Sequence, residues 1–172
     1  LALCGPADKL VNRGFVIDDA GEIRARYDKI HLFDVDLPTG ESWRESSVYR
    51  HGSEAVIVNG TPVGKLGLTI CYDIRFPALF ARLAEANADL IAVPAAFTVP
   101  TGQAHWEVLL RARAIEAGAF VVAAAQSGRH ADGRYTLEGA EARGGKRPVT
   151  KEINDGARAL EGRILQIYTA AR

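Results

Sequence analysis

Residues 64–77 read Gly64-Lys65-Leu66-Gly67-Leu68-Thr69-Ile70-Cys71-Tyr72-Asp73-Ile74-Arg75-Phe76-Pro77. The apolar run in this stretch predicts a strand that ends just before Cys71. Pro77 suits the first turn of a helix, and the apolar spacing continues that helix from Ala78 to Asn87. A cysteine between a strand and a helix is a candidate nucleophile, but a lone free cysteine is usually a small core residue. Both interpretations of Cys71 stay open on this stretch alone.

Strand signals precede this stretch. Two hairpins are predicted, one from Val11 to Ile17 and Glu22 to Ile30, and another from Ala55 to Val58 and Val63 to Ile70 with Asn59-Gly60 as its turn. Residues 34–53 are rich in Asp, Pro, Gly and Ser and predict a long loop between the hairpins.

Helix and strand signals alternate after the stretch. They predict a buried strand from Leu90 to Val93, a helix from about Ala104 to Ala117 that Gly118 stops, and a second buried strand from Phe120 to Ala125. Strand, helix, strand, helix and strand in this order indicate an α/β layered fold. Residues 137–172 are rich in glycine and charge, so we expect a loose tail with a weak helix from Ala157 to Tyr168.

The bulk composition narrows the class of protein. A chain of 172 residues with 48% hydrophobic side chains is long and apolar enough for one globular domain. Lys plus Arg equals Asp plus Glu at 21 each, which favours a small molecule or another protein as partner over nucleic acid or an anionic membrane. No apolar run reaches the roughly 18 residues that a membrane span needs. No glycine fingerprint of a nucleotide site follows a strand.

The two cysteines, Cys4 and Cys71, lie far apart and lack zinc-type spacing. We therefore expect no metal site, no cofactor and no structural disulfide, and a reducing, cytoplasmic setting. The chain contains no methionine, and residues 1–4 lack the features of a signal peptide. We expect the chain to begin inside a longer protein.

Lys29 stands where an extended run meets a loop, in Tyr27-Asp28-Lys29-Ile30-His31-Leu32-Phe33-Asp34. A lysine at a strand end is often solvated, but the apolar neighbours here favour partial burial, and a buried ammonium can stabilise an oxyanion. A lysine and a helix N-terminus beside Cys71 would lower its pKa and raise the thiolate fraction. The four histidines, His31, His51, His105 and His130, have no spacing that demands a Cys–His dyad.

Successive blocks of the chain carry a family resemblance. They are Asp28–Asp34, Glu45-Ser46, Thr69–Pro77, Pro94-Ala95-Ala96-Phe97-Thr98 and His105–Glu116. In order and spacing they resemble the nitrilase, or carbon-nitrogen hydrolase, superfamily, from about Leu10 to about Thr136. They are most similar to its Nit-type amidase branch, which includes ω-amidase and deaminated glutathione amidase.

The resemblance implies an α-β-β-α sandwich that pairs with a second subunit, and a Glu-Lys-Cys triad. Cys71 matches the nucleophile, Lys29 matches the triad lysine, and the backbone N–H of Tyr72 would join Lys29 in holding the oxyanion. Glu45 matches a second glutamate that positions the lysine and substrate, although a loop carboxylate is usually solvated.

Strand-end loops are where α/β proteins build sites, so Arg75, Phe97 and Thr98 are candidate pocket residues for a small carboxylated amide. Arg75 could equally form an ion pair with Asp73, and Phe97 could belong to the core. The helix from Ala104 to Ala117 also predicts surface charge pairs among Glu107, Arg111, Arg113 and Glu116.

Two departures from the family pattern make the expected sandwich incomplete. The triad glutamate, the general base, belongs well before Lys29, where residues 1–28 offer no matching context. Leu137-Glu138-Gly139-Ala140 replaces the segment that the family carries after Thr136. We therefore expect a partial hydrolase domain at residues 1–136 and a divergent tail at residues 137–172.

Two functions remain. One is an amidase that releases ammonia from a small carboxylated amide through a cysteine thioester. The other is a catalytically impaired fragment that serves as a binding or assembly module.

Overall fold

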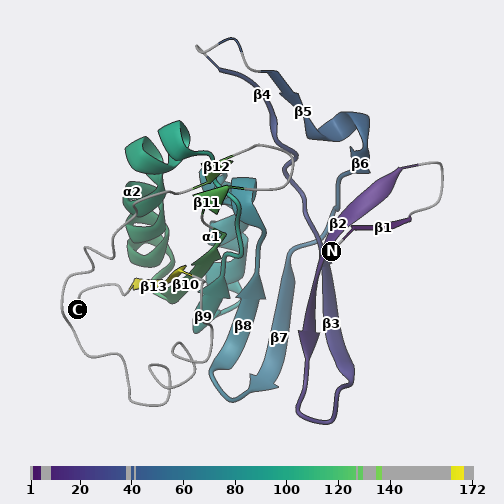
Figure 1. Ribbon diagram of the computed structural model, residues 1–172. Coiled ribbons are helices and arrows are strands. Elements are labelled where there is room, and N and C mark those ends of the chain that lie inside the picture. Colours follow the sequence, from purple (N-terminus) through teal and green to yellow (C-terminus); the bar gives the residue numbers. More distant parts are fainter. Residues whose placement is uncertain are drawn as a thin grey trace.

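The computed structural model describes residues 2–4, 9–37, 40, 42–126, 128–129, 135–136 and 164–168. A five-stranded sheet forms its centre, in the order β13-β10-β9-β8-β7 (Figure 1). Its strands are β7 (Val56–Thr61), β8 (Gly64–Leu68), β9 (Leu90–Ala92), β10 (Phe120–Ala125) and β13 (Ile164–Tyr168). The pairs β8/β9 and β9/β10 are parallel, so the chain must cross over between them.

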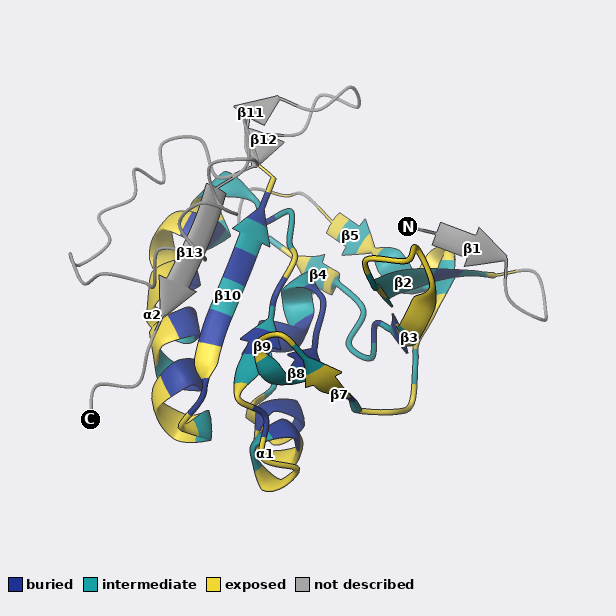
Figure 2. Cartoon of the chain, turned by 90° about the horizontal axis from the view of Figure 1, so that it is seen from below, coloured by how far each residue is buried: buried dark blue, intermediate teal, exposed yellow. Residues whose placement is uncertain are grey.

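Two helices make these crossovers, α1 (Pro77–Glu85) and α2 (Val99–Ala117). Both turn their buried sides towards the sheet, and the fully buried strand residues Ile91, Val121 and Ala123 belong to the same core (Figure 2). Gly67 allows the close approach of α1, because a Cβ there would lie 3.2 Å from Leu83 Cδ1. The prediction of alternating strands and helices is confirmed, and the result is a mixed α/β fold.

A second sheet is formed by the N-terminal part of the chain. It contains β1 (Ala2–Cys4), β2 (Leu10–Ile17) and β3 (Ile23–Asp28), with β6 (Tyr49–Arg50) pairing to β2. The antiparallel pair β2/β3 is the hairpin that the sequence predicts, and β3 lies beside β7 of the central sheet (Figure 1).

The predicted loop at residues 34–53 is wrong in part. It contains a hairpin of β4 (Asp34–Asp36) and β5 (Ser42–Arg44), the short 3₁₀ helix η1 (Glu45–Ser47) and strand β6. Arg44 and Asp36 form an ion pair across β4 and β5, which offsets the weak strand propensity of these polar residues.

The turn of the second hairpin also differs from its prediction. Thr61 pairs with Gly64, so the chain reverses at Pro62-Val63, while Asn59-Gly60 falls inside β7 where the register shifts. Proline presets the backbone angle that the first central turn position needs, which favours this site over Asn59-Gly60.

Helix α1 begins at Pro77 as predicted but ends at Glu85, two residues before the predicted Asn87, whereas α2 ends at Ala117 as predicted. Gly118 directly after α2, and Asn87 one residue beyond the Ala86 that caps α1, both take a positive φ of 60°, as expected of left-handed helix ends. Helix α2 begins at Val99, before the predicted Ala104, because Pro100 fits the first turn of a helix.

The tail is described only in part. Residues 164–168, expected in a weak helix, instead form β13, which pairs antiparallel with β10. The apolar residues of this segment gain backbone hydrogen bonds along the edge of β10, which outweighs a weak helical pattern. A short pair of β11 (Gly128–Arg129) and β12 (Tyr135–Thr136) precedes it. The rest of the predicted tail helix lies outside the described residues.

Candidate active site

Cys71 occupies a sharp change of backbone direction between β8 and the 3₁₀ helix η2 (Cys71–Arg75). Its φ of +50° is unfavourable for a residue with a Cβ, and such strain persists only where surrounding contacts enforce it. The N–H of Cys71 donates to the carbonyl of Pro94 (2.9 Å), and the N–H of Thr69 donates to that of Ala92 (3.2 Å). The cysteine therefore sits at the end of the parallel strands, where the segments after β8 and β9 meet.

Lys29 follows β3 directly and is 3% exposed, so the solvated alternative is excluded. Its Nζ donates to Glu45 Oε2 at 2.5 Å. Glu45 accepts two more hydrogen bonds, from the N–H of Phe33 (2.6 Å) and from Asn12 Nδ2 (3.2 Å). Glu45 is thus not an exposed loop acid; it neutralises the buried lysine and orients it.

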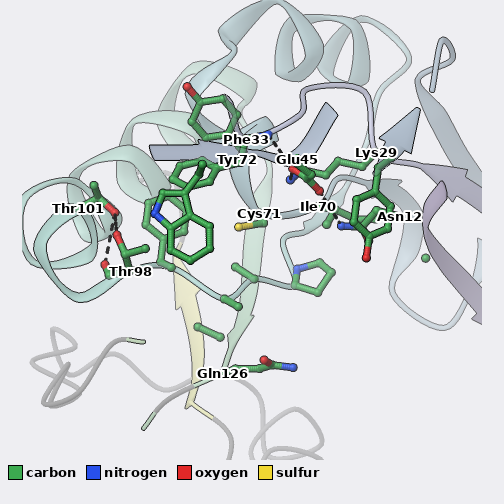
Figure 3. Close-up of a pocket in the computed structure, with 18 of the residues that line it drawn as sticks. Asn12, Lys29, Phe33, Glu45, Ile70, Cys71, Tyr72, Thr98, Thr101 and Gln126 are labelled. Carbon is green, nitrogen blue, oxygen red and sulfur yellow. Dashed lines mark hydrogen bonds and ion pairs between the residues drawn. The ribbon is translucent and has the colours of Figure 1, made fainter. Parts of the chain in front are cut away.

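Cys71, Lys29 and Glu45 line one cavity of about 810 Å³. Figure 3 shows the sulfur of Cys71 near the middle of the drawn residues, with Lys29 and Glu45 on one side and Thr98 and Thr101 on the other. Further lining residues include the polar or aromatic side chains of Asn12, Arg13, Phe33, Trp43, Arg44, Tyr49, Tyr72, Phe97 and Gln126. Backbone from both sheets contributes to one concave site.

Burial raises the pKa of the Cys71 thiol above its ordinary value. The charge of Lys29 and a hydrogen bond from the backbone of Ala96 act in the opposite direction but do not outweigh burial. The prediction of a depressed pKa is therefore wrong for this chain, because the desolvation of the thiolate outweighs its attraction to the ammonium.

The backbone N–H of Tyr72 is available at this turn. Within the described part of the chain it has no main-chain acceptor, whereas the neighbouring N–H groups of Cys71 and Asp73 donate to Pro94 and Ile70. A free N–H beside the sulfur, together with an ammonium, is the donor pair that stabilises a negative oxygen.

The predicted substrate residues lie in different places. Thr98 lines the cavity, and its Oγ1 is 2.6 Å from Thr101 Oγ1. Phe97 also lines it while packing in the core against Trp106, with ring centroids 4.7 Å apart. Arg75 is not among the lining residues; its guanidinium lies over the rings of Tyr72 and Phe97, which form the wall. Their roles in substrate binding stay predictions.

Asp73 does not pair with Arg75, contrary to one of the alternatives. Its carboxylate is fully buried and accepts from Tyr27 Oη (2.7 Å) and from the imidazole Nδ1 of His31 (2.8 Å). Arg75 lies instead within 3.4 Å of His105 Nδ1. The sequence offers one signal for this network, since an acid three residues after the residue that precedes a helix can accept from that residue's backbone N–H, as Asp73 does from Ile70.

None of the histidines in the described residues lines the cavity, so no Cys–His dyad forms among them. His31 is held by Asp73, and its ring stacks on Phe76 with centroids 3.7 Å apart. His130 lies outside the described residues. Those residues also contain no cluster of side chains suited to a metal ion, and none of their helices is long and apolar enough to cross a membrane.

The charge pairs of α2 are confirmed with one correction. Glu107 and Arg111 form an exposed pair, and Arg113 pairs with Glu116 (2.6 Å). Arg113, however, is 5% exposed, and its Nε donates to the carbonyl of Ile74 (2.8 Å). It is therefore a buried clamp between α2 and η2, because the carbonyls of a short 3₁₀ turn need partners.

The fold and the cavity together define an α/β protein whose site combines a cysteine with a buried lysine–glutamate pair. The chain belongs to the carbon-nitrogen hydrolase family, whose sequence profile matches residues 6–141. This confirms the resemblance to the nitrilase superfamily.

Individual relatives agree with this assignment. The deaminated glutathione amidase of Yersinia enterocolitica is 53% identical over 130 residues, which cover 75% of this chain and 45% of that protein. The deaminated glutathione amidase of Dictyostelium discoideum is 49% identical over 126 residues, 73% of this chain and 43% of that protein. The chain thus spans less than half the length of these two relatives.

Solved structures show the same likeness. The NitFhit protein of Caenorhabditis elegans matches with a TM-score of 0.69 and 47% identity over 75% of this chain and 31% of that chain. A mutant amidase from Nesterenkonia sp. AN1, with acrylamide added at its active-site cysteine, matches with a TM-score of 0.64 and 25% identity over 78% of this chain and 50% of that chain.

Proposed function

We propose that this chain carries the nucleophile and the oxyanion site of an amidase that releases ammonia from a small carboxylated amide. The observation that supports it is the single cavity lined by Cys71, Lys29 and Glu45. The deaminated glutathione amidases that the chain resembles suggest an amide of this kind as substrate.

The reaction begins when the sulfur of Cys71, having lost its proton, attacks the amide carbonyl carbon. A C–S bond forms and the carbonyl π electrons move to oxygen, where the Lys29 ammonium and the Tyr72 N–H stabilise the charge. Collapse of this intermediate breaks the C–N bond, and the nitrogen takes a proton and leaves as ammonia. Water then attacks the thioester, the C–S bond breaks, and the acid and the free thiol are restored.

The proton of Cys71 needs an acceptor. Glu45 and Asp73 both act electrostatically on this thiol, but each carboxylate is already engaged by several donors. We therefore assign the general base to a glutamate that the described residues do not contain, as the family resemblance implies.

We also infer that a second layer covers the central sheet in the complete protein, giving an α-β-β-α sandwich that pairs with another copy. Leu66, Ala92 and Val122 are only partly buried on the sheet face opposite the helices. Partly covered apolar strands of this kind favour a further layer or subunit. We place the enzyme in the cytoplasm, where a nucleophilic thiol stays reduced.

The test is ammonia release from α-ketoglutaramate and from deaminated glutathione. The chain of 172 residues is compared with a version extended at its N-terminus by the genomic sequence upstream of Leu1. Release by the extended protein that Cys71→Ala abolishes supports the proposal. An extended protein without activity on either amide, or one unaffected by Cys71→Ala, contradicts it.

A catalytically impaired binding or assembly module is the second candidate, favoured by the raised pKa of Cys71 and the full engagement of Glu45. The pH dependence of Cys71 alkylation separates the two. An amidase requires that Cys71 of the extended protein be alkylated with a midpoint below the ordinary thiol pKa of about 8.5, because a cation beside the sulfur favours the thiolate. An inert module keeps the high midpoint in both forms.

A further inference from the structure

Asp73 links the two halves of the candidate site. Its carboxylate is 0% exposed and accepts four hydrogen bonds, from Tyr27 Oη (2.7 Å), the N–H of Ile70 (2.8 Å), the N–H of His31 (3.0 Å) and His31 Nδ1 (2.8 Å). A carboxylate can accept this many hydrogen bonds because its two oxygens together offer about four lone-pair sites. None of the steps assigned to Cys71 and Lys29 uses Asp73 chemically.

The donors come from both catalytic segments. Tyr27 and His31 stand two positions before and two positions after Lys29, and Ile70 directly precedes Cys71. One carboxylate therefore fastens the backbone around the lysine to the backbone around the cysteine. The segments belong to different sheets, so their relative position depends on contacts between the sheets.

Other contacts fix each segment separately. The N–H of Lys29 donates to Asn12 on β2, and its carbonyl accepts from Gly52. The N–H of Cys71 donates to Pro94 after β9. These bonds hold each segment within its own sheet. Between the two segments, the Asp73 carboxylate acts together with the ring contacts of His31 on Phe76 and of Phe33 on Tyr72.

The backbone conformation of Cys71 depends on the hydrogen bonds around it, including those of Asp73. A non-glycine residue at φ +50° returns to a commoner conformation when its restraints weaken. Asp73 restrains this turn directly through the N–H of Ile70, and its own N–H donates to the carbonyl of Ile70 (3.1 Å). Loss of the carboxylate frees the turn and the lysine segment together.

We propose that Asp73 is a positioning residue that holds the Lys29 ammonium against the Cys71 turn. The inference rests on the proposed function only in taking Cys71 as the nucleophile and Lys29 as its neighbouring cation. Asp73 touches neither substrate nor sulfur in this role; it acts through Tyr27, His31 and Ile70.

The test measures how strongly Lys29 acts on Cys71 with and without the Asp73 carboxylate. Cys4 is replaced by serine so that iodoacetamide reports on Cys71 alone. The alkylation rate is then followed from pH 6 to 10 for the chain with and without Lys29→Met, in the Asp73 and the Asp73→Asn backgrounds. With Asp73 present, Lys29→Met should slow alkylation at pH 7 by about tenfold, the effect of a pKa rise of about one unit.

In the Asp73→Asn background the same Lys29→Met change should alter the rate by less than about threefold, because the ammonium no longer stays near the sulfur. Asp89→Asn is the matched control. Asp89 also accepts a backbone N–H, that of Lys65 (2.7 Å), but away from the cavity, so the full effect of Lys29 should persist.

Circular dichroism checks that each variant folds. If Asp73→Asn does not fold, Tyr27→Phe replaces it as the test variant, since it keeps the ring and removes one of the donors to Asp73. In the Tyr27→Phe background, Lys29→Met should slow alkylation at pH 7 by no more than half as many fold as with Tyr27 present. An effect of Lys29→Met that is equal in both backgrounds overturns the positioning role and leaves the amidase proposal standing. No effect of Lys29→Met even with Asp73 present overturns the proposed catalytic pairing itself.

Discussion

The buried ion pair between Lys29 and Glu45 allows a quantitative test of how the site is held together. The lysine is 3% exposed and the glutamate 14%, and the two atoms Nζ and Oε2 lie 2.5 Å apart. Glu45→Gln keeps the shape of the side chain and one oxygen for the N–H of Phe33, but it removes the charge that balances the ammonium. Lys29 is then a buried cation without a counterion.

Breaking a buried pair by removing one partner costs about 3–5 kcal/mol. Because Glu45 keeps some contact with water and its amide replacement keeps one hydrogen bond, we expect about 3 kcal/mol, the lower end of that range. For a chain of this length each kcal/mol lowers the melting temperature by about 2–4 °C, so the expected drop is about 6–12 °C.

The assay is urea unfolding followed by tryptophan fluorescence, together with a thermal scan by circular dichroism. Glu107→Gln is the matched control, because its pair with Arg111 is more than half exposed and should change the free energy of unfolding by less than about 0.5 kcal/mol. Lys29→Met combined with Glu45→Gln should cost less than the sum of the two single changes. Equal losses for Glu45→Gln and Glu107→Gln, or strict additivity of the double variant, would refute the reasoning.

Three further outcomes are expected. Gly52→Ala should destabilise the chain by about 1–3 kcal/mol in urea unfolding, since its Cβ would overlap the carbonyl of Asp28; an unchanged midpoint would contradict this. Arg113→Met should cost about 2–3 kcal/mol by loss of its buried hydrogen bonds, against less than about 0.5 kcal/mol for the exposed Arg111→Met, and similar values would exclude the clamp. Arg13 holds the pKa of Asp28 below its usual value, so the stability that this pair adds is present above the unfolded pKa of about 3.9 and is lost as the pH falls through the lower folded value. The free energy of unfolding, measured from pH 2 to 6, should therefore decrease less steeply with acid in Arg13→Gln than in the unchanged chain. An equal slope in the two proteins would rule out a contribution of the Arg13–Asp28 pair to stability.

Local patterns predicted the parts of the fold where local physics dominates. The apolar run before Cys71, the helix after Pro77 and the left-handed ends at Asn87 and Gly118 depend on neighbouring residues, and the structure contains all of them. The apolar spacing predicts a start of α2 at Ala104, whereas Pro100 indicates the earlier start that the structure has. Such errors arise because a helix start lacks the repeated contacts that mark its middle.

Residues 34–53 and 164–168 show the opposite case. Their sequences have weak local preferences, so strand pairing decides their structure: β4 with β5 within one hairpin, and β13 with β10, about 40 residues earlier in the chain. The strand propensity of such segments depends on the surface that they meet.

The sequence by itself determined the family, the order of strands and helices from residue 56 to residue 125, and the two residues, Cys71 and Lys29, that line one cavity. The tertiary structure alone decided what surrounds them. It placed Asp73 among donors from the segments around Lys29 and Cys71, buried Lys29, and buried the thiol of Cys71 enough to raise its pKa. The physical reason is that burial and electrostatic interaction depend on distances across the sheets, which the order of residues along a chain does not specify.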